Sequence, residues 1–397
     1  MTSHILLLGT DFLNPIGDKN IWFNMLPYLI KEFDSISVIS VSVRKNEVEW
    51  QDINGRRIYI HNCRPVVRPG PNVEEYANTL GMGRRTRYQN ELMRTSALLR
   101  MVALIRRINS TSKLTHVHFL NHFGPFSIFP RPFLPDMAYT LSVMGYIGSH
   151  PFRDLFLRPT YQSFNMIAVT SQEHKVLLGN FGIEPERIRV IRWGVPEMLR
   201  VSDAEKRELK EKFGIPKDSV VFLWSGFIMQ IREREFYATI QYVKEIAPRL
   251  KNAYFIFSFK PEFYREQYRQ WENERIRIIY NPHQFHSILR MSDALFSPIV
   301  SRDAIVTPPL TWLESMALGI PIITTMAGGV TEVISHGLDG VIAQDFSQLE
   351  EVIGRFIQDP TLRSKMSVAC QKKILEKFNV KSTAEGYIKM WKECDAL

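Results

Sequence analysis

One loop near the N-terminus has the residue types that hold a phosphate. The apolar run at residues 4–9 predicts a buried strand, and an apolar-faced helix is predicted to follow and to end near Phe33. Gly17 lies in the loop between them, where a glycine lets the backbone approach a phosphate and the helix N-terminus favours its negative charge. A plain turn explains a single glycine equally well. The chain has no Walker-type loop and no zinc-type Cys/His spacing.

Two histidines alternate in a strand predicted at residues 114–120. Period-two alternation places His116 and His118 on one face, and His118 is nearer the carboxyl end, where parallel sheets bind ligands. A histidine there either exchanges protons at a site or is a hydrogen-bonded core residue, and both interpretations stay open. His122, in the exit loop of the strand, is a second candidate.

The elements that must position such residues are clearest between residues 294 and 334. An apolar run at 294–298 predicts a strand end, Thr307-Pro308-Pro309 predicts a helix start, and Gly319 predicts the end of that helix. A second apolar run at 320–325 predicts another strand, and Gly328-Gly329 predicts a tight turn into a short helix. This order of elements is typical of a parallel α/β sheet.

The same stretch contains LESMALG at residues 313–319, Pro321 and GGVTE at residues 328–332. With Asp293 before it, the stretch resembles the donor-binding segment of retaining family 4 glycosyltransferases, which have the GT-B fold. That family carries a Glu-x7-Glu motif. Glu314 matches its second Glu, whereas Val306 stands where the first Glu is expected.

The resemblance implies further donor-binding residues in the second half of the chain. In the family, a Gly-Arg-Leu turn and a following Lys neutralise the donor diphosphate. Gly226 matches the Gly, Phe227 occupies the Arg position, and Arg232 occupies the Lys position with Arg234 beside it. Arg can replace Lys as a phosphate clamp, although a solvated helix start explains the same two arginines.

Catalytic roles are thus implied for His118, Arg232 and Glu314, of which Glu314 corresponds to the Glu that hydrogen-bonds the nucleotide ribose. Donor binding is implied for Gly17, Gly226, Arg232, Arg234, Thr307, Leu310, Thr311, Glu314, Gly328 and Gly329. No metal and no bound cofactor are implied, because cationic side chains hold the diphosphate of the co-substrate.

Two series of alternating strands and helices predict an α/β protein with two Rossmann-like domains facing across a cleft. Residues 1–198 are expected to form an acceptor-side domain, which includes a predicted loop at 146–158 with Arg153 and Arg158. Residues 199–378 are expected to form the nucleotide-sugar domain. The resemblance implies that residues 379–397 form a helix that crosses back and packs on the first domain.

The composition is that of a globular protein, since 45% of the 397 residues are hydrophobic and 23% are charged. No apolar run approaches the roughly 20 residues of a membrane-spanning helix, and no signal peptide is recognisable at the N-terminus. Cys63, Cys370 and Cys394 are isolated, which favours a reducing cytoplasm.

Positive charge is concentrated in the first half of the chain. Residues 1–198 hold 23 Lys and Arg against 16 Asp and Glu, whereas the remainder holds 27 against 25. A basic helical region at residues 79–109 predicts either a solvated surface or docking on anionic lipid at the inner face of the membrane. A nucleic-acid partner would rest on charge alone, and we do not predict one.

Two functions follow from these patterns. The first is transfer of a sugar from a nucleotide-diphosphate sugar to a glycan or lipid-linked acceptor, with retention of anomeric configuration. The second is a GT-B protein without transferase activity that acts as a nucleotide-sugar-binding or partner subunit. Val306 and Phe227, which replace a family Glu and a family Arg, support the second function.

Overall fold

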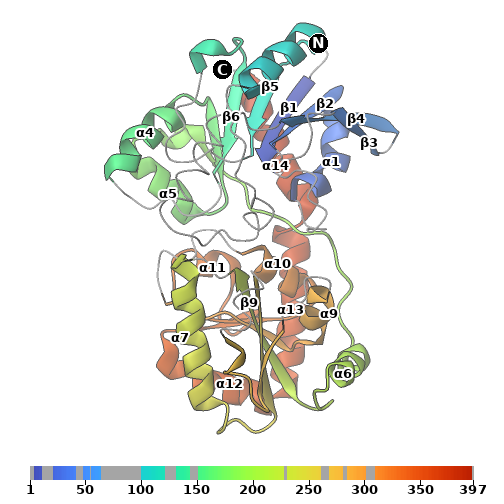
Figure 1. Cartoon of the computed structure of the whole chain (residues 1–397), viewed down its shortest axis with the longest axis vertical. Coiled ribbons are helices and arrows are strands. Elements are labelled where there is room, and N and C mark those ends of the chain that lie inside the picture. The colour runs from blue at the N-terminus through green and yellow to red at the C-terminus, as the bar shows by residue number, and fades with distance from the viewer. Residues whose placement is uncertain are drawn as a thin grey trace. The chain divides into compact units, whose positions relative to one another are not determined.

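A computed structural model describes residues 4–10, 21–41, 48–53, 55–63, 100–120, 131–143, 151–227, 230–260, 268–279, 284–300 and 309–395. These residues form two compact units (Figure 1). The first unit contains the described residues up to Gly194 together with those from Val380 onward, and the second contains Val195–Asn379. The chain therefore leaves the first unit and returns to it for its last helix.

The first unit is built on a sheet whose described strands follow the order β3-β4-β2-β1-β5-β6-β7-β8. Every pairing is parallel except that between β3 and β4. The strands are β1 His4–Thr10, β2 Ser35–Val41, β3 Val48–Ile53, β4 Arg56–Cys63, β5 His116–Phe119, β6 Ala138–Ser142, β7 Met166–Val169 and β8 Ile188–Val190.

Helices accompany this sheet as expected for an α/β unit. They are α1 Ile21–Glu32, a helix at 100–112, α4 Pro151–Gln162, α5 Gln172–Asn180 and α14 Val380–Asp395, with 3-10 turns at Arg131–Phe133 and Pro185–Arg187. The last helix, drawn in red in Figure 1, packs against α1 and also contacts β6 and β7. Trp22 of α1 and Tyr387 of α14 meet with ring centroids 4.6 Å apart. The aromatic face of α14 thus completes the core of the first unit.

Two features of this unit differ from the sequence-based expectation. The loop predicted at residues 146–158 is helical from Pro151, because proline fits the first turn of a helix, where its missing N–H leaves no bond unmade. The antiparallel hairpin of β3 and β4 was not predicted. Its turn depends on Gly55, which has φ +77° and donates its N–H to Asp52 Oδ1 over 2.9 Å.

The second unit is built on a fully parallel sheet with the described strand order β11-β10-β9-β12-β13-β14. Numbered within the unit, this is the order 3-2-1-4-5-6 of dinucleotide-binding sheets. The strands are β9 Val220–Phe227, β10 Ala253–Lys260, β11 Ile276–Ile278, β12 Ala294–Phe296, β13 Ile322–Thr325 and β14 Gly340–Ala343.

Helices lie on both faces of the second sheet (Figure 1). They are α6 Asp203–Lys212, α7 Gln230–Ile246, α9 Phe285–Met291, α10 Leu310–Ala317, α11 Val330–Val333, α12 Leu349–Gln358 and α13 Pro360–Lys377, with a 3-10 turn at Phe346–Gln348.

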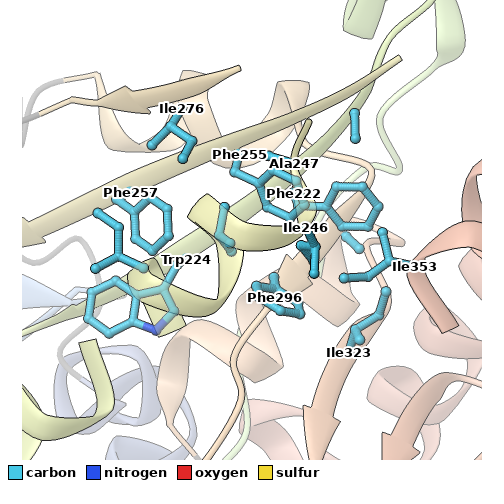
Figure 2. Close-up of a cluster of buried hydrophobic side chains, with 14 of the residues drawn as sticks. Phe222, Trp224, Ile246, Ala247, Phe255, Phe257, Ile276, Phe296, Ile323 and Ile353 are labelled. Carbon is cyan, nitrogen blue, oxygen red and sulfur yellow. The ribbon is translucent and has the colours of Figure 1, made fainter. Parts of the chain in front are cut away.

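An aromatic core joins this sheet to α7 and α12. Phe222 of β9 stacks on Phe255 of β10 with ring centroids 5.1 Å apart, and Phe296 of β12 meets both rings edge-on (Figure 2). Ile246 of α7 and Ile353 of α12 belong to the same buried cluster. Because this core runs through neighbouring strands, it keeps their carboxyl ends in a fixed register.

The predicted elements between residues 294 and 334 are confirmed in type and order. Gly319 lies just after α10 with φ +76°, and a Cβ there would lie 2.5 Å from the Ser367 hydroxyl. Both the left-handed backbone and the close approach require glycine. The predicted start at Thr307-Pro308 lies outside the described residues, and Pro309 occupies the N-cap position without a side-chain hydrogen bond.

A buried ion cluster lies at the amino ends of the strands of the second sheet, away from their carboxyl ends. Asp293, directly before β12, accepts hydrogen bonds from Lys210 Nζ over 2.7 Å and from Lys206 Nζ over 3.3 Å. It also accepts the Val221 backbone N–H over 2.9 Å, while Lys210 Nζ donates to the Ser219 carbonyl. The cluster fastens α6 to the central strands β9 and β12.

Candidate functional site

The strand order of the second sheet marks one point as a candidate ligand site. β9 and β12 are hydrogen-bonded neighbours, yet the chain continues from them to opposite sides of the sheet. Open α/β sheets bind ligands beyond the carboxyl ends of the strands at such a switch point. The residues that follow β9 and β12 are therefore the candidate functional residues.

The segment Ser297–Val300, which we call the exit segment, leaves β12 at this point. Its backbone is held by β13: the hydroxyl of Thr325 accepts the Ile299 N–H over 2.7 Å and donates to the Ile299 carbonyl over 2.6 Å. The hydroxyl of Thr324 donates to the Ser297 carbonyl over 2.7 Å. The hydroxyls of Thr324 and Thr325 thus bond the backbone of the exit segment, where the regular hydrogen bonds between β12 and β13 have ended.

The helix α10 begins at the same edge and carries three predicted site residues. Trp312 of α10 donates its indole N–H to the Ser297 hydroxyl over 3.1 Å, which fixes the first turn against the exit segment. Leu310 and Thr311 are half-buried in this turn, and Glu314 is 3% exposed. Thr307 and Val306 lie outside the described residues.

The predicted phosphate-binding residues lie at the end of β9 and directly after it. Gly226 is half-buried near the end of the strand, and a Cβ there would lie 3.0 Å from the Trp224 ring. Phe227 ends β9, and Arg232 is the third residue of α7. Arg234, two residues later, is exposed. One stretch of chain at the switch point therefore carries Gly226 and both arginines.

The predicted glycine turn follows β13. Gly329 precedes α11 with φ +71°, a left-handed conformation that glycine adopts without strain. Gly328 beside it is half-buried. In the second unit, the described site residues therefore lie at or after the ends of β9, β12 and β13, which are neighbours in the sheet. Because these strands are parallel, the residues share the carboxyl edge of the sheet. Gly17 lies outside the described residues.

His118 belongs to the first unit and lies in its core. Its side chain is 0% exposed, with Nδ1 2.8 Å from the Thr140 hydroxyl and Nε2 2.9 Å from the Ser142 hydroxyl. The rings of Trp22, Tyr387 and Trp391 surround it at centroid distances of 5.1, 5.3 and 5.2 Å. The structure thus places His118 where α14 docks, with no exposed surface.

This burial gives a pH-dependent stability. Desolvation, together with the nearby His116, holds the pKa of His118 well below its usual 6.5. Below about pH 6.5 the unfolded chain therefore binds a proton that the folded chain excludes, and the unfolding free energy should fall by up to ~1.4 kcal/mol per pH unit. Urea denaturation between pH 5 and 7 should show a shallower slope for His118→Gln. An unchanged slope would exclude His118 as its source.

Several contacts at the switch point were not predicted from sequence. Thr324, Thr325, Trp312 and Glu235 are in contact with the exit segment. One local feature of the sequence could have indicated the carboxyl edge of the sheet: polar residues at the end of a buried strand, as in Thr324-Thr325 at the end of β13.

The described residues also bear on membrane and metal binding. Of the predicted basic region, only residues 100–109 are described, where Arg106 and Arg107 are exposed. In the described part of the chain, no helix is long and apolar enough to cross a bilayer. The same residues contain no group of three or more His, Cys, Asp or Glu side chains arranged to hold a metal ion.

Comparison with protein families gives a match over part of the second unit. Residues 262–373 match the family described as glycosyl transferases group 1. D-inositol 3-phosphate glycosyltransferase 1 of Catenulispora acidiphila is 25% identical over 210 residues, which cover 49% of each chain. Human alpha-1,3/1,6-mannosyltransferase ALG2 is 32% identical over 74 residues, 18% of each chain. These matches span about half or less of the relatives' length.

Solved structures match nearly the whole chain. Sucrose-phosphate synthase of Thermosynechococcus elongatus has a TM-score of 0.72 at 12% identity, covering 99% of both chains. Anabaena Alr3699/HepE, in complex with UDP and glucose, has a TM-score of 0.69 at 11% identity, covering 98% of this chain and all of that one. These neighbours confirm the predicted fold class, α/β with the GT-B architecture.

Proposed function

We propose that this protein transfers a sugar from a nucleotide-diphosphate sugar to a glycan or lipid-linked acceptor, with retention of anomeric configuration. The observation that carries the proposal is that predicted donor-binding residues follow neighbouring strands at the carboxyl edge of the second sheet, at the switch point and directly beside it. Glu314 and the Gly328-Gly329 turn follow adjacent strands there, and both lie within the matched residues 262–373. The nucleotide complex of a structural neighbour supports the same ligand class.

Each predicted residue then has a role in donor binding. Arg232 and Arg234 neutralise the diphosphate, whose charge grows as it leaves the sugar. The amides of the Gly328-Gly329 turn provide further donors, and Glu314 hydrogen-bonds the nucleotide ribose. We assign the donor-sugar contacts to Thr307, Leu310 and Thr311. The described part of the first unit supplies the acceptor side, and we assign His118 a structural role in its core.

A second candidate function is that of a nucleotide-sugar-binding subunit without transferase activity. Phe227 ends β9 where the family has an Arg, so one cation at the diphosphate is missing from this position. This observation favours a subunit that binds nucleotide sugars without transferring them. Release of nucleoside diphosphate from UDP-, GDP-, ADP- and dTDP-sugars, with a lipid-linked acceptor present, separates the two functions. Binding without release would support the subunit, and binding of none would contradict both.

Glu314→Gln tests the ribose assignment. Hydrogen bonds to a charged group contribute about 1.5–3 kcal/mol and those to a neutral group about 0.5–1.5 kcal/mol, so the variant, which keeps a neutral acceptor, should bind the nucleoside diphosphate roughly 5- to 10-fold more weakly. Isothermal titration calorimetry measures the loss, and the melting temperature without ligand checks that the fold is kept. Glu351→Gln, on the exposed side of α12, is the matched control and should bind normally. Unchanged affinity in Glu314→Gln would remove the ribose role.

A further inference from the structure

A carboxylate from α7 reaches across the switch point to the exit segment. Glu235 lies in the second turn of α7, its side chain is 5% exposed, and its Oε2 accepts the backbone N–H of Val300. We propose that Glu235 is a positioning residue for donor binding, which fixes the exit of β12 relative to the start of α7. This role rests on the proposed function.

The position of this contact distinguishes it from the others on the exit segment. Thr324, Thr325 and Trp312 hold Ser297 and Ile299 from β13 and α10, on one side of the switch point. Among the described residues, Glu235 alone holds the segment from α7, which follows β9 on the other side. Loss of its carboxylate would therefore remove this bond between the exit segment and α7, the helix that follows β9.

Glu235 also connects the two parts of the predicted donor site. It follows Arg232 by three residues and Arg234 by one, so it shares a helix start with both arginines. Its partner Val300 belongs to the exit segment, whose Ser297 hydroxyl accepts the Trp312 indole N–H and thereby contacts α10, the helix that carries Glu314. A displacement of either part by about 1 Å is enough to lower a rate about 100-fold.

The chemistry of the contact favours a role in positioning. A buried carboxylate is costly unless hydrogen bonds compensate it, and a charge-assisted bond to a backbone N–H is among the strongest available. A neutral side chain would fill the same space without this desolvation cost, and the bond to Val300 offsets part of the cost of the charge. Because Glu235 binds the backbone of the exit segment, we assign it a role that acts through Val300 and not a contact with the reacting atoms.

The test combines a structural and a functional measurement on the full chain. In Glu235→Ala, amide hydrogen exchange at Val300 should accelerate at least ~10-fold, because the N–H loses its acceptor. The affinity for the nucleotide sugar that the wild type binds, chosen from UDP-, GDP-, ADP- and dTDP-sugars, should fall about 10-fold, and kcat about 100-fold. Glu235→Gln keeps an acceptor oxygen and should restore most of both.

Control variants separate this role from general damage. Glu245→Gln changes an exposed carboxylate at the other end of α7 and should behave as wild type. If Glu235→Ala does not fold, Glu235→Asp gives the same measurement, since it keeps the charge and withdraws it from Val300 by one methylene.

Two results would overturn the proposal. Unchanged exchange at Val300 would show that the Glu235 carboxylate does not hold the Val300 N–H, and faster exchange with unchanged affinity and kcat would show that this bond does not position the donor. Failure of the proposed function gives a different result, because the wild type itself would then bind none of the four nucleotide sugars.

Discussion

Arg232→Ala is expected to lower kcat for sugar transfer by about 10²- to 10³-fold. The diphosphate gains negative charge as the bond to the sugar breaks, so a cation held beside it stabilises the transition state more than the bound donor. Arg232 is the third residue of α7, directly after the exit of β9 at the switch point. The affinity for the donor should fall less than kcat, which steady-state kinetics with varied donor will resolve.

Two further variants sharpen this result. Arg232→Lys keeps the charge but loses the bidentate geometry, so it should retain more of the activity than alanine does. Arg277→Ala removes an exposed arginine from β11, at the edge of the same sheet, and should leave kcat unchanged. Wild-type kcat in Arg232→Ala would show that another group stabilises the leaving diphosphate.

Asp293→Ala should lower the free energy of unfolding by about 3–5 kcal/mol, because it leaves buried Lys210 without its counter-charge. The loss can be measured by urea denaturation near pH 7. Glu350→Ala breaks the Arg249–Glu350 pair, which is exposed, and should cause no measurable change. A loss for Asp293→Ala as small as that of the control would mean that water replaces the carboxylate at Lys210.

Acid should produce part of the same loss in the wild type. Burial alone would raise the pKa of Asp293, but Lys206, Lys210 and the Val221 N–H outweigh it and hold the pKa below its usual 3.8. The folded chain therefore keeps Asp293 ionised where the unfolded chain has already bound a proton. This stabilisation is complete above the usual pKa and disappears as the pH falls through the folded-state pKa. Denaturation between pH 2 and 5 should show this decline, and it should be weaker in Asp293→Asn.

Local patterns in the sequence predicted much of the second unit. Gly319 marks the end of α10 because glycine adopts its left-handed backbone angle without strain and leaves room for its close neighbour. Continuous apolar runs predicted the buried strands β9 and β10, since parallel strands covered on both faces need no polar alternation. Such signals lie within a few residues of one another, so they can be recognised without a structure.

The contacts at the candidate site could not be predicted in this way. Glu235 and Val300 are 65 residues apart, and only the pairing of β9 with β12 brings them together. Lys206 and Lys210 resemble solvated residues of an amphipathic helix, yet both contact Asp293, more than 80 residues later. The identity of a residue says little about such partners until the strand order is known.

The return of the chain to the first unit has a consequence for biosynthesis. Among the described residues, the second unit is one continuous stretch, Val195–Asn379, which is synthesised before α14 begins. The first unit, although translated earlier, lacks Tyr387 and Trp391 over His118 and Trp22 until the ribosome reaches them. We therefore expect the first unit to complete its core only after α14 has been synthesised, and until then the nascent chain keeps an uncovered aromatic face that chaperones can recognise.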